Sequence, residues 1–215
     1  MSPRVWRFGE PVAPLAEILD RGGVLAVPTE SSYGLAADPL SAEGIETIFR
    51  LKGRDAGKAL PLVAADLEQI AALGADPEGP EMARLARVAG RIWPGPLTVV
   101  LPVRGHLSGA VDLPAAAPDG TVAVRIPAHE GLRGLLAALG RPLTATSANR
   151  AGEPPVLTPE AAARLLAGAD AAVVDGGRLP GGPPSTVVRL VPGEVEVLRE
   201  GAVPASEARR LLADC

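Results

Sequence analysis

The stretch Val24-Leu-Ala-Val-Pro-Thr-Glu-Ser-Ser-Tyr-Gly-Leu35 decides how the chain is organised. Residues 24–27 form a short apolar run after two glycines, which predicts a buried strand. Three hydroxyl side chains and one acid follow at residues 29–32. Because α/β folds bind ligands at the carboxyl ends of their strands, this polar cluster predicts a binding site.

A helix follows this stretch and carries a lysine on its inward face. Ser41 is a typical N-cap residue, and Ile45, Ile48 and Phe49 have the spacing of one helix face. Lys52 continues that face one turn later. Since burying a lysine without a partner is costly, we expect its ammonium group to face a cleft.

Basic residues gather at the end of this helix. Lys52, Arg54 and Lys58 lie within seven residues, and the two lysines are the only ones among 21 basic residues. A lysine is a compact point charge of the kind that suits a single phosphate, so the cluster predicts a phosphate site. The alternative is a chance placement on a solvated helix end.

The composition restricts the class of protein. Hydrophobic residues make up 47% of the 215 residues and aromatic residues only 2%, so the core must consist of Leu, Val, Ala and Ile. The net charge of −4 gives no general attraction to nucleic acid. The single cysteine, Cys215, excludes an internal disulfide, and no apolar run has the length of a membrane span. These features predict an unexported, cytoplasmic protein with no membrane contact.

The remaining patterns predict an α/β fold, which we expect to be an open, twisted, mixed β-sheet with packed helices. Helices are expected near residues 15–19, 67–73, 80–92, 132–139, 158–167 and 206–213. Strands are expected near 59–64, 97–101, 121–126, 143–146, 171–174, 186–190 and 195–199. The last two strands are separated by Pro192-Gly193, which favours a hairpin. We expect residues 1–215 to form one domain, with an irregular excursion at 103–120.

The common catalytic fingerprints do not occur in the sequence. There is no Gly-x-Ser-x-Gly nucleophile elbow, no Walker A motif and no G-x-G-x-x-G. Cys215 has no histidine near it, and we expect His106 and His129 to be ordinary rather than catalytic. No pair of His or Cys residues has metal-ligand spacing, so no metal site made of protein side chains is expected.

Hydroxyls, amides and cations instead recur where predicted strands begin or end: Thr29, Ser31, Arg125, Ser147, Asn149, Ser185 and Arg199. An arginine inside an apolar strand requires a carboxylate or phosphate partner, which is either a ligand or an acid in a buried ion pair. Residues 147–149 fit a plain turn as well as a binding loop. The glycine-rich stretch 176–184 is either a simple loop or a place where backbone approaches a ligand. The repetition of such groups at strand ends favours a binding site.

Six segments in order resemble a known family: Pro28-Thr-Glu-Ser-Ser-Tyr-Gly-Leu35, Lys52-Gly-Arg54, Trp93-Pro-Gly-Pro-Leu-Thr98, Thr121-Val-Ala-Val-Arg-Ile-Pro127, Thr146-Ser-Ala-Asn149 and Ser185-Thr-Val-Val188. Together they are similar to the YrdC-like family of threonylcarbamoyl-AMP synthases over residues 10–203. The resemblance implies a YrdC-like fold with one concave, positively lined face. It also implies the short bacterial form, without an additional C-terminal domain.

The resemblance implies an activity and a set of partners. Family members make L-threonylcarbamoyladenylate from L-threonine, bicarbonate and ATP, and they release pyrophosphate. The Mg²⁺ ion would be carried by ATP. A transferase complex then moves the threonylcarbamoyl group to adenosine 37 of tRNA, which gives N6-threonylcarbamoyladenosine. Weak RNA binding by the basic face is a further expectation.

The roles of individual residues are carried over position by position. Arg125 would clamp the carboxylate of L-threonine, and the hydroxyls of Ser31, Ser147 and Ser185 would orient its amine and side chain. The positions around ATP match Arg54, Lys58, Thr121, Asn149 and Arg199. Lys52 should also face phosphate, and with Arg54 it is expected to neutralise charge that develops during catalysis.

This chain departs from the family pattern in three places. Ser31-Ser32 replaces the Thr-Val of many members but keeps a hydroxyl, and Asp55 replaces the usual proline. Some members place a histidine near the threonine at the end of the next strand, where this chain reads Leu62-Val-Ala-Ala65. The contact made by that histidine is therefore not expected here.

Two other functions stay open from the sequence. One is carbamoyl adenylation, as in the related module of hydrogenase-maturation carbamoyltransferases, which are large multidomain chains. The other is an RNA-binding module without catalysis. The net charge of −4 and the scarcity of aromatic side chains that could stack on bases disfavour the second.

Overall fold

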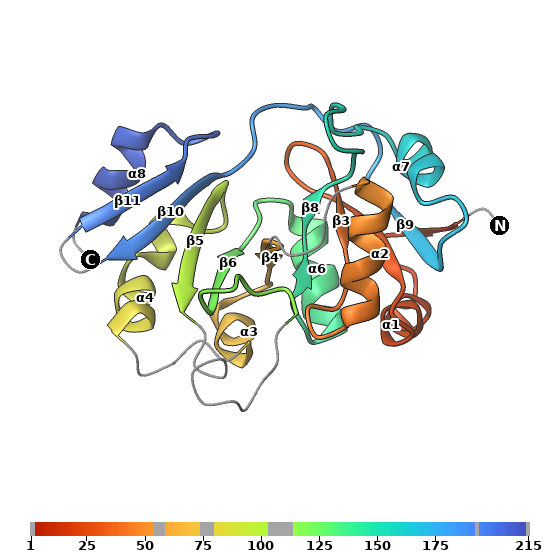
Figure 1. Cartoon of the computed structure of the whole chain (residues 1–215), viewed down its shortest axis with the longest axis horizontal. Coiled ribbons are helices and arrows are strands. Elements are labelled where there is room, and N and C mark those ends of the chain that lie inside the picture. The colour runs from red at the N-terminus through yellow and green to blue at the C-terminus, as the bar shows by residue number, and fades with distance from the viewer. Residues whose placement is uncertain (1–2, 54–58, 74–79, 103–113, 192–193, 214–215) are drawn as a thin grey trace.

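Two mixed β-sheets with helices packed on them make up the fold of this protein (Figure 1). The structure is a computed structural model that describes residues 3–53, 59–73, 80–102, 114–191 and 194–213. The α/β class with open, mixed sheets that the sequence predicts is confirmed. The strands are divided between two hydrogen-bonded sheets, where the sequence suggested one.

The first sheet has five strands, and its central strands are buried on both faces. Its order is β1 (Arg4–Arg7), β9 (Ala171–Asp175), β2 (Val24–Pro28), β3 (Tyr33–Ala36) and β8 (Thr146–Ser147). Strand β2 is parallel to β9 and antiparallel to β3. Val24 and Ala26 pack into one hydrophobic cluster, whereas Leu25 and Val27 pack into another on the opposite face. Burial of both faces explains why β2 is a continuous apolar run without alternation.

The second sheet has six strands. Its order is β11 (Glu194–Arg199), β10 (Thr186–Val191), β5 (Leu97–Pro102), β6 (Thr121–Arg125), β4 (Leu62–Val63) and β7 (Leu143–Thr144). Strands β10 and β11 form the predicted antiparallel hairpin, and β10 lies parallel to β5. The strand predicted at 59–64 is only two residues long, and it lies between β6 and β7 rather than at an edge. Pro61, which has no N–H to donate, directly precedes it.

The two sheets meet at residues 143–147, and this explains why one predicted strand became two. Strand β7 belongs to the second sheet and β8 to the first, with only Ala145 between them. The Ala145 N–H donates to the Pro61 carbonyl at 2.7 Å. Thr144 holds the other sheet: its N–H donates to the Ala37 carbonyl at 2.9 Å, and its Oγ1 accepts from the Ala37 N–H at 2.8 Å.

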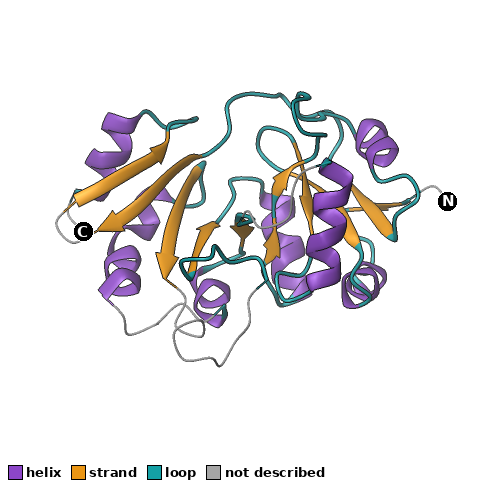
Figure 2. Ribbon diagram, in the orientation of Figure 1, coloured by secondary structure: helices purple, strands orange, loops and turns teal. Residues whose placement is uncertain are grey.

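Helices pack against the two sheets (Figure 2). They are α1 (Ala13–Asp20), α2 (Ala42–Lys52), α3 (Leu67–Ala72), α4 (Pro80–Ile92), α6 (Glu130–Leu139), α7 (Pro159–Leu165) and α8 (Ala205–Leu212). The side chains of Ser41, Asp66 and Thr158 accept hydrogen bonds from the first turns of α2, α3 and α7. Gly53 ends α2 in the left-handed conformation, with φ of 58°.

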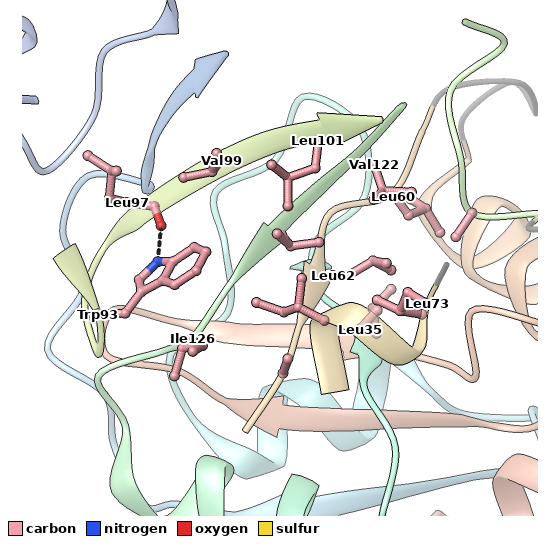
Figure 3. Packing of buried hydrophobic residues seen from close by; sticks show 14 of the residues in the cluster. Leu35, Leu60, Leu62, Leu73, Trp93, Leu97, Val99, Leu101, Val122 and Ile126 are labelled. Carbon is pink, nitrogen blue, oxygen red and sulfur yellow. Dashed lines mark hydrogen bonds between the residues drawn. The ribbon is translucent and has the colours of Figure 1, made fainter. Parts of the chain in front are cut away.

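The core between the two sheets is built mainly from aliphatic side chains, as the composition required. Figure 3 shows Leu97, Val99 and Leu101 of β5 packed with Leu62 of β4. Trp93 lies among them, and its indole N–H donates to the Leu97 carbonyl at 2.7 Å, so its polar atom is satisfied. Among the described residues, no helix is long and apolar enough to cross a membrane.

Candidate functional site

The polar cluster at residues 29–32 is a tight β-hairpin turn between β2 and β3. Pro28 pairs with Tyr33 across the hairpin. The Thr29 hydroxyl donates to the Ser32 carbonyl at 2.8 Å, and it accepts from the Ser32 N–H at 3.3 Å. These bonds fix the turn so that Glu30 and Ser31 line a pocket. The sequence interpretation, a strand that ends in polar groups, missed strand β3, because its four residues leave too short a pattern to recognise.

Arg125 ends β6 and forms an ion pair with Glu30 of this turn. Its side chain is 12% exposed and that of Glu30 is 24% exposed. Burial, with a smaller contribution from the charge of Arg199, lowers the pKa of Arg125 to about 10. The guanidinium therefore stays charged at neutral pH. The sequence allowed two kinds of partner for this arginine, a ligand or an acid in a buried ion pair. The structure shows an acid, Glu30.

Three further predicted residues reach the same place from other elements. Ser147 comes from β8, Ser185 immediately precedes β10, and Arg199 ends β11. The hydroxyls of Ser185 and Thr98 are 2.8 Å apart, and Arg199 donates to the Ser185 carbonyl at 2.8 Å. Burial lowers the pKa of Arg199 as well. The hydrogen bond from Arg199 thereby ties the end of β11 to the residue that precedes β10.

These side chains line one pocket of about 310 Å³ between the two sheets. Its lining includes the turn at 29–34, residues 145–147 of the first sheet, and residues 61–63 of the second. The linker 176–185, which runs from β9 to β10 across the top of Figure 1, contributes Gly182, Pro184 and Ser185. This linker is held to the turn because the Gly181 N–H donates to the Ser31 carbonyl at 2.9 Å.

Tyr33 also holds the linker. Its phenol accepts from the Gly176 N–H at 3.0 Å and donates to the Gly177 carbonyl at 2.9 Å. The ring is fully buried, and burial raises the pKa of the phenol. Tyr33 therefore acts as a fixed brace between the β2–β3 hairpin and the linker.

Lys52 lies behind the pocket, with its ammonium against the 147–149 loop. It is 4% exposed and donates to the Ser147 carbonyl at 2.5 Å, the Asn149 Oδ1 at 3.0 Å and the Asn149 carbonyl at 3.3 Å. The Ser147 hydroxyl donates to the same Oδ1 at 2.6 Å. The sequence correctly predicted that this lysine points inward. What it meets there is two backbone carbonyls and one side-chain oxygen of the 147–149 loop.

Predicted site residues fall into three groups. Ser31, Arg125, Ser147, Ser185 and Arg199 line the pocket. Lys52 and Asn149 lie next to Ser147 and are bonded to it. Thr121 begins β6, at the end opposite Arg125, and its hydroxyl donates to Asp119 Oδ1 at 2.6 Å. Arg54 and Lys58 lie outside the described residues, as do His106, Pro192-Gly193, Cys215 and most of the predicted excursion at 103–120.

Glu30, Thr29 and Thr98 belong to the pocket but were absent from the predicted set. The signal for Glu30 was present, because an arginine in an apolar strand calls for an acid. The sequence could not say which of the 25 acids it would be. Leu62 and Val63 line the pocket in the region where some family members have a histidine.

The one described histidine has a structural contact. His129 caps α6, and its Nδ1 accepts from the Leu132 N–H at 3.1 Å. Burial lowers the pKa of this imidazole, which keeps Nδ1 available as an acceptor. Over the described part of the chain, no group of three or more His, Cys, Asp or Glu side chains is placed to hold a metal ion.

Comparisons with known proteins show which family the chain resembles along its length. A family model described as telomere recombination, named for Sua5, YciO and YrdC, matches residues 17–201. The chain is 40% identical over 181 residues to a threonylcarbamoyl-AMP synthase of Thiobacillus denitrificans, covering 82% of this chain and 89% of that one. It is 36% identical over 204 residues to a threonylcarbamoyl-AMP synthase of Pyrococcus abyssi, covering 93% of this chain and 56% of that one.

A solved structure is similar over nearly the whole fold. Pyrococcus abyssi Sua5 in complex with L-threonine superposes with a TM-score of 0.80 at 34% identity, covering 98% of this chain and 61% of that one. This chain thus spans a little over half the length of its Pyrococcus relatives, but most of the length of the Thiobacillus one.

Proposed function

Because the chain belongs to the Sua5/YciO/YrdC family, we propose that it is an L-threonylcarbamoyladenylate synthase. It would join L-threonine, bicarbonate and ATP and release pyrophosphate. Relatives of similar and of greater length bear the name threonylcarbamoyl-AMP synthase. The enzyme would be a nucleotidyltransferase, because it moves an adenylyl group from ATP to an oxygen of the carbamate.

The observation that carries this proposal is the convergence of four side chains on one pocket. Ser31, Arg125, Ser147 and Ser185 come from four separate segments, and all line the space between the sheets. A buried guanidinium with three hydroxyls around it suits a small polar acid such as L-threonine. A pocket of about 310 Å³ falls within the range of small-molecule sites and is large enough for an amino acid.

For the nucleotide, we propose the positions that the family resemblance supplied. Arg199 lines the pocket, and Asn149 is two residues beyond the lining at 145–147. Thr121 is about 13 Å from Arg125 along β6, at about 3.3 Å a residue. An ATP molecule that touches both Thr121 and the pocket must therefore lie along β6. Arg54 and Lys58 would meet the phosphates, whereas the ammonium of Lys52 holds the 147–149 loop.

The proposed chemistry has two steps. The neutral amine of L-threonine attacks bicarbonate, and water leaves to give a carbamate. A carbamate oxygen then attacks the α-phosphorus of ATP, and pyrophosphate leaves with the electron pair of the broken P–O bond. No enzyme nucleophile is needed, so the protein would act by positioning the reactants and by neutralising charge.

Mg²⁺ would enter with ATP and neutralise charge on the phosphates. Only one acid, Glu30, lines the pocket among the described residues, and it is paired with Arg125. We therefore assign the ion no protein ligands. The product would pass to a transferase complex that modifies tRNA in the cytoplasm, with at most weak RNA binding by this chain. We further propose that residues 1–215 act as one domain.

A reaction mixture tests the proposal directly. The protein is incubated with ATP, Mg²⁺, bicarbonate and L-threonine, and the adenylate is sought by mass spectrometry while pyrophosphate release is followed. We expect both signals to require threonine and bicarbonate. Pyrophosphate release that depends on carbamoyl phosphate instead would identify a carbamoyl-adenylating enzyme. Tight RNA binding without ATP turnover would identify an RNA-binding module.

Replacing Arg54 tests the catalytic assignment. Loss of one charge-stabilising group from a transition state typically costs about 10²–10³ in rate. Arg54→Ala is therefore expected to nearly abolish pyrophosphate release. A rate within about threefold of wild type would contradict the assignment, because the loss of a cation that stabilises the transition state should slow the reaction much more than that.

A further inference from the structure

Glu30 is the one acid in the pocket lining, and the proposed chemistry gives it no task. It lies in the β2–β3 turn, next to Ser31, and it is paired with Arg125 across the two sheets. If neutralising Arg125 were its only purpose, both carboxylate oxygens would be expected to find partners inside the protein. In the described part of the chain, only one of the two oxygens has a hydrogen-bond partner.

The carboxylate of Glu30 is only half satisfied. Its Oε1 accepts from Arg125 Nη1. Its Oε2 is buried and has no hydrogen-bond partner in the part of the chain that the structure describes. A buried carboxylate oxygen without a donor is unfavourable, so this atom is a ready acceptor for a donor that a ligand brings into the pocket.

Arg125 has the complementary capacity. A guanidinium carries five N–H donors in a planar fork, and within the described part of the chain Arg125 uses one of its nitrogens to bond Glu30. Arg125 can therefore keep Glu30 on Nη1 and present its remaining donors to a carboxylate. The pair then offers a cation and an anion side by side on one pocket wall.

We propose that Glu30 is a specificity-determining residue that binds the α-ammonium group of the amino-acid substrate through Oε2, while Arg125 binds the carboxylate. This inference rests on the proposed function, since it assigns a contact to the same substrate. The two charges of the zwitterion would meet the two charges of the pair. A carboxylic acid without the amine would satisfy Arg125 but leave Oε2 of Glu30 buried and unpaired.

This arrangement predicts strong discrimination in the wild-type protein. L-threonine and (R)-3-hydroxybutyrate have the same carboxylate and hydroxyl, and they differ by the α-ammonium group. A site with a buried polar group made for one ligand donor rejects the analogue that lacks the donor. We expect L-threonine to bind about 100-fold more tightly, measured by isothermal titration calorimetry without ATP. A preference below about fivefold would overturn the inference.

Glu30→Gln separates recognition from architecture. Glutamine keeps an acceptor for Arg125 but loses the negative charge, so the affinity for L-threonine should fall by about 10- to 100-fold. The affinity for (R)-3-hydroxybutyrate should be unchanged or higher, because Arg125 loses its competing anion. Equal losses for both ligands, or unchanged threonine affinity, would overturn the inference.

Two controls keep the outcomes distinct. Glu160→Gln removes an exposed acid in the first turn of α7, outside the pocket lining, and should change neither affinity. Glu30→Asp keeps the charge on a shorter side chain and should restore part of the preference for the zwitterion. If wild-type protein binds no L-threonine at all, the proposed function itself fails, which differs from a Glu30 variant that loses both ligands in parallel.

Discussion

Lys52 and Arg125 are both buried cations, but the protein surrounds them differently. The ammonium of Lys52 donates to three oxygens of the 147–149 loop, which matches the three donors that a lysine has. The guanidinium of Arg125 meets Glu30 in a pocket wall, and one oxygen of that carboxylate has no hydrogen-bond partner among the described residues.

The difference separates a structural cation from a binding one. Around Lys52 the protein itself supplies the oxygens, so the residue fixes the loop that presents Ser147. Around Arg125 the protein supplies one contact and leaves donors over a pocket, so the residue is poised for a ligand. Both side chains are largely buried and both are cations. They differ in how many of their N–H donors have acceptors in the described part of the protein.

Replacing Arg125 should have the largest effect, and this effect should be on the use of L-threonine rather than on stability. Arg125→Met removes the carboxylate clamp, so threonine-dependent pyrophosphate release is expected to fall by about 10²–10³. The double variant Arg125→Met with Glu30→Gln removes both charges of the pair, so its free energy of unfolding should stay nearer to wild type than that of Arg125→Met alone. Activity close to wild type in Arg125→Met would place the substrate elsewhere.

Replacing Lys52 should act mainly on stability. Lys52→Met leaves three loop oxygens without their charged donor, and we expect the free energy of unfolding in urea to fall by about 2–4 kcal/mol. Arg50→Met is the matched control on the same helix, since Arg50 is exposed and its side chain donates to the Thr47 hydroxyl at 3.1 Å. Its change should stay within about 0.5 kcal/mol.

The same variant can contradict the comparison. If Lys52 serves mainly as the phosphate ligand that the sequence suggested, Lys52→Met will keep its stability and raise the KM for ATP instead. Loss of stability together with a raised KM for L-threonine, through displacement of Ser147, is the result that our assignment of Lys52 as a structural cation predicts.

The smallest effect is expected from Thr98, which holds Ser185 from behind. Thr98→Val keeps the shape of a buried side chain but removes the hydroxyl that lies 2.8 Å from Ser185 Oγ. We expect the KM for L-threonine to rise by about three- to tenfold with kcat unchanged, because only ground-state positioning is lost. Thr47→Val, a similar change outside the pocket lining, serves as the control. A fall in kcat alone would show that Ser185 takes part in the chemical step.

Local patterns in the sequence predicted most elements, because their signals lie within a few residues. The cap at Ser41 and the apolar face of α2 required only helical spacing, and Lys52 was correctly placed on that face. Strands β1 and β3 were missed, since a strand of four residues leaves too short a pattern to recognise. The split into two sheets was also hidden, because it depends on hydrogen bonds at Ala145 to a distant segment.

By itself, then, the sequence determined the α/β class, the family and the inward direction of Lys52. It also identified five of the residues that line the pocket: Ser31, Arg125, Ser147, Ser185 and Arg199. Only the tertiary structure decided which partner each buried charge has. Glu30 and Arg125 are 95 positions apart, as are Lys52 and Ser147. Such pairs form because the two sheets bring distant segments together, and no periodic pattern in the sequence indicates which segments will be in contact.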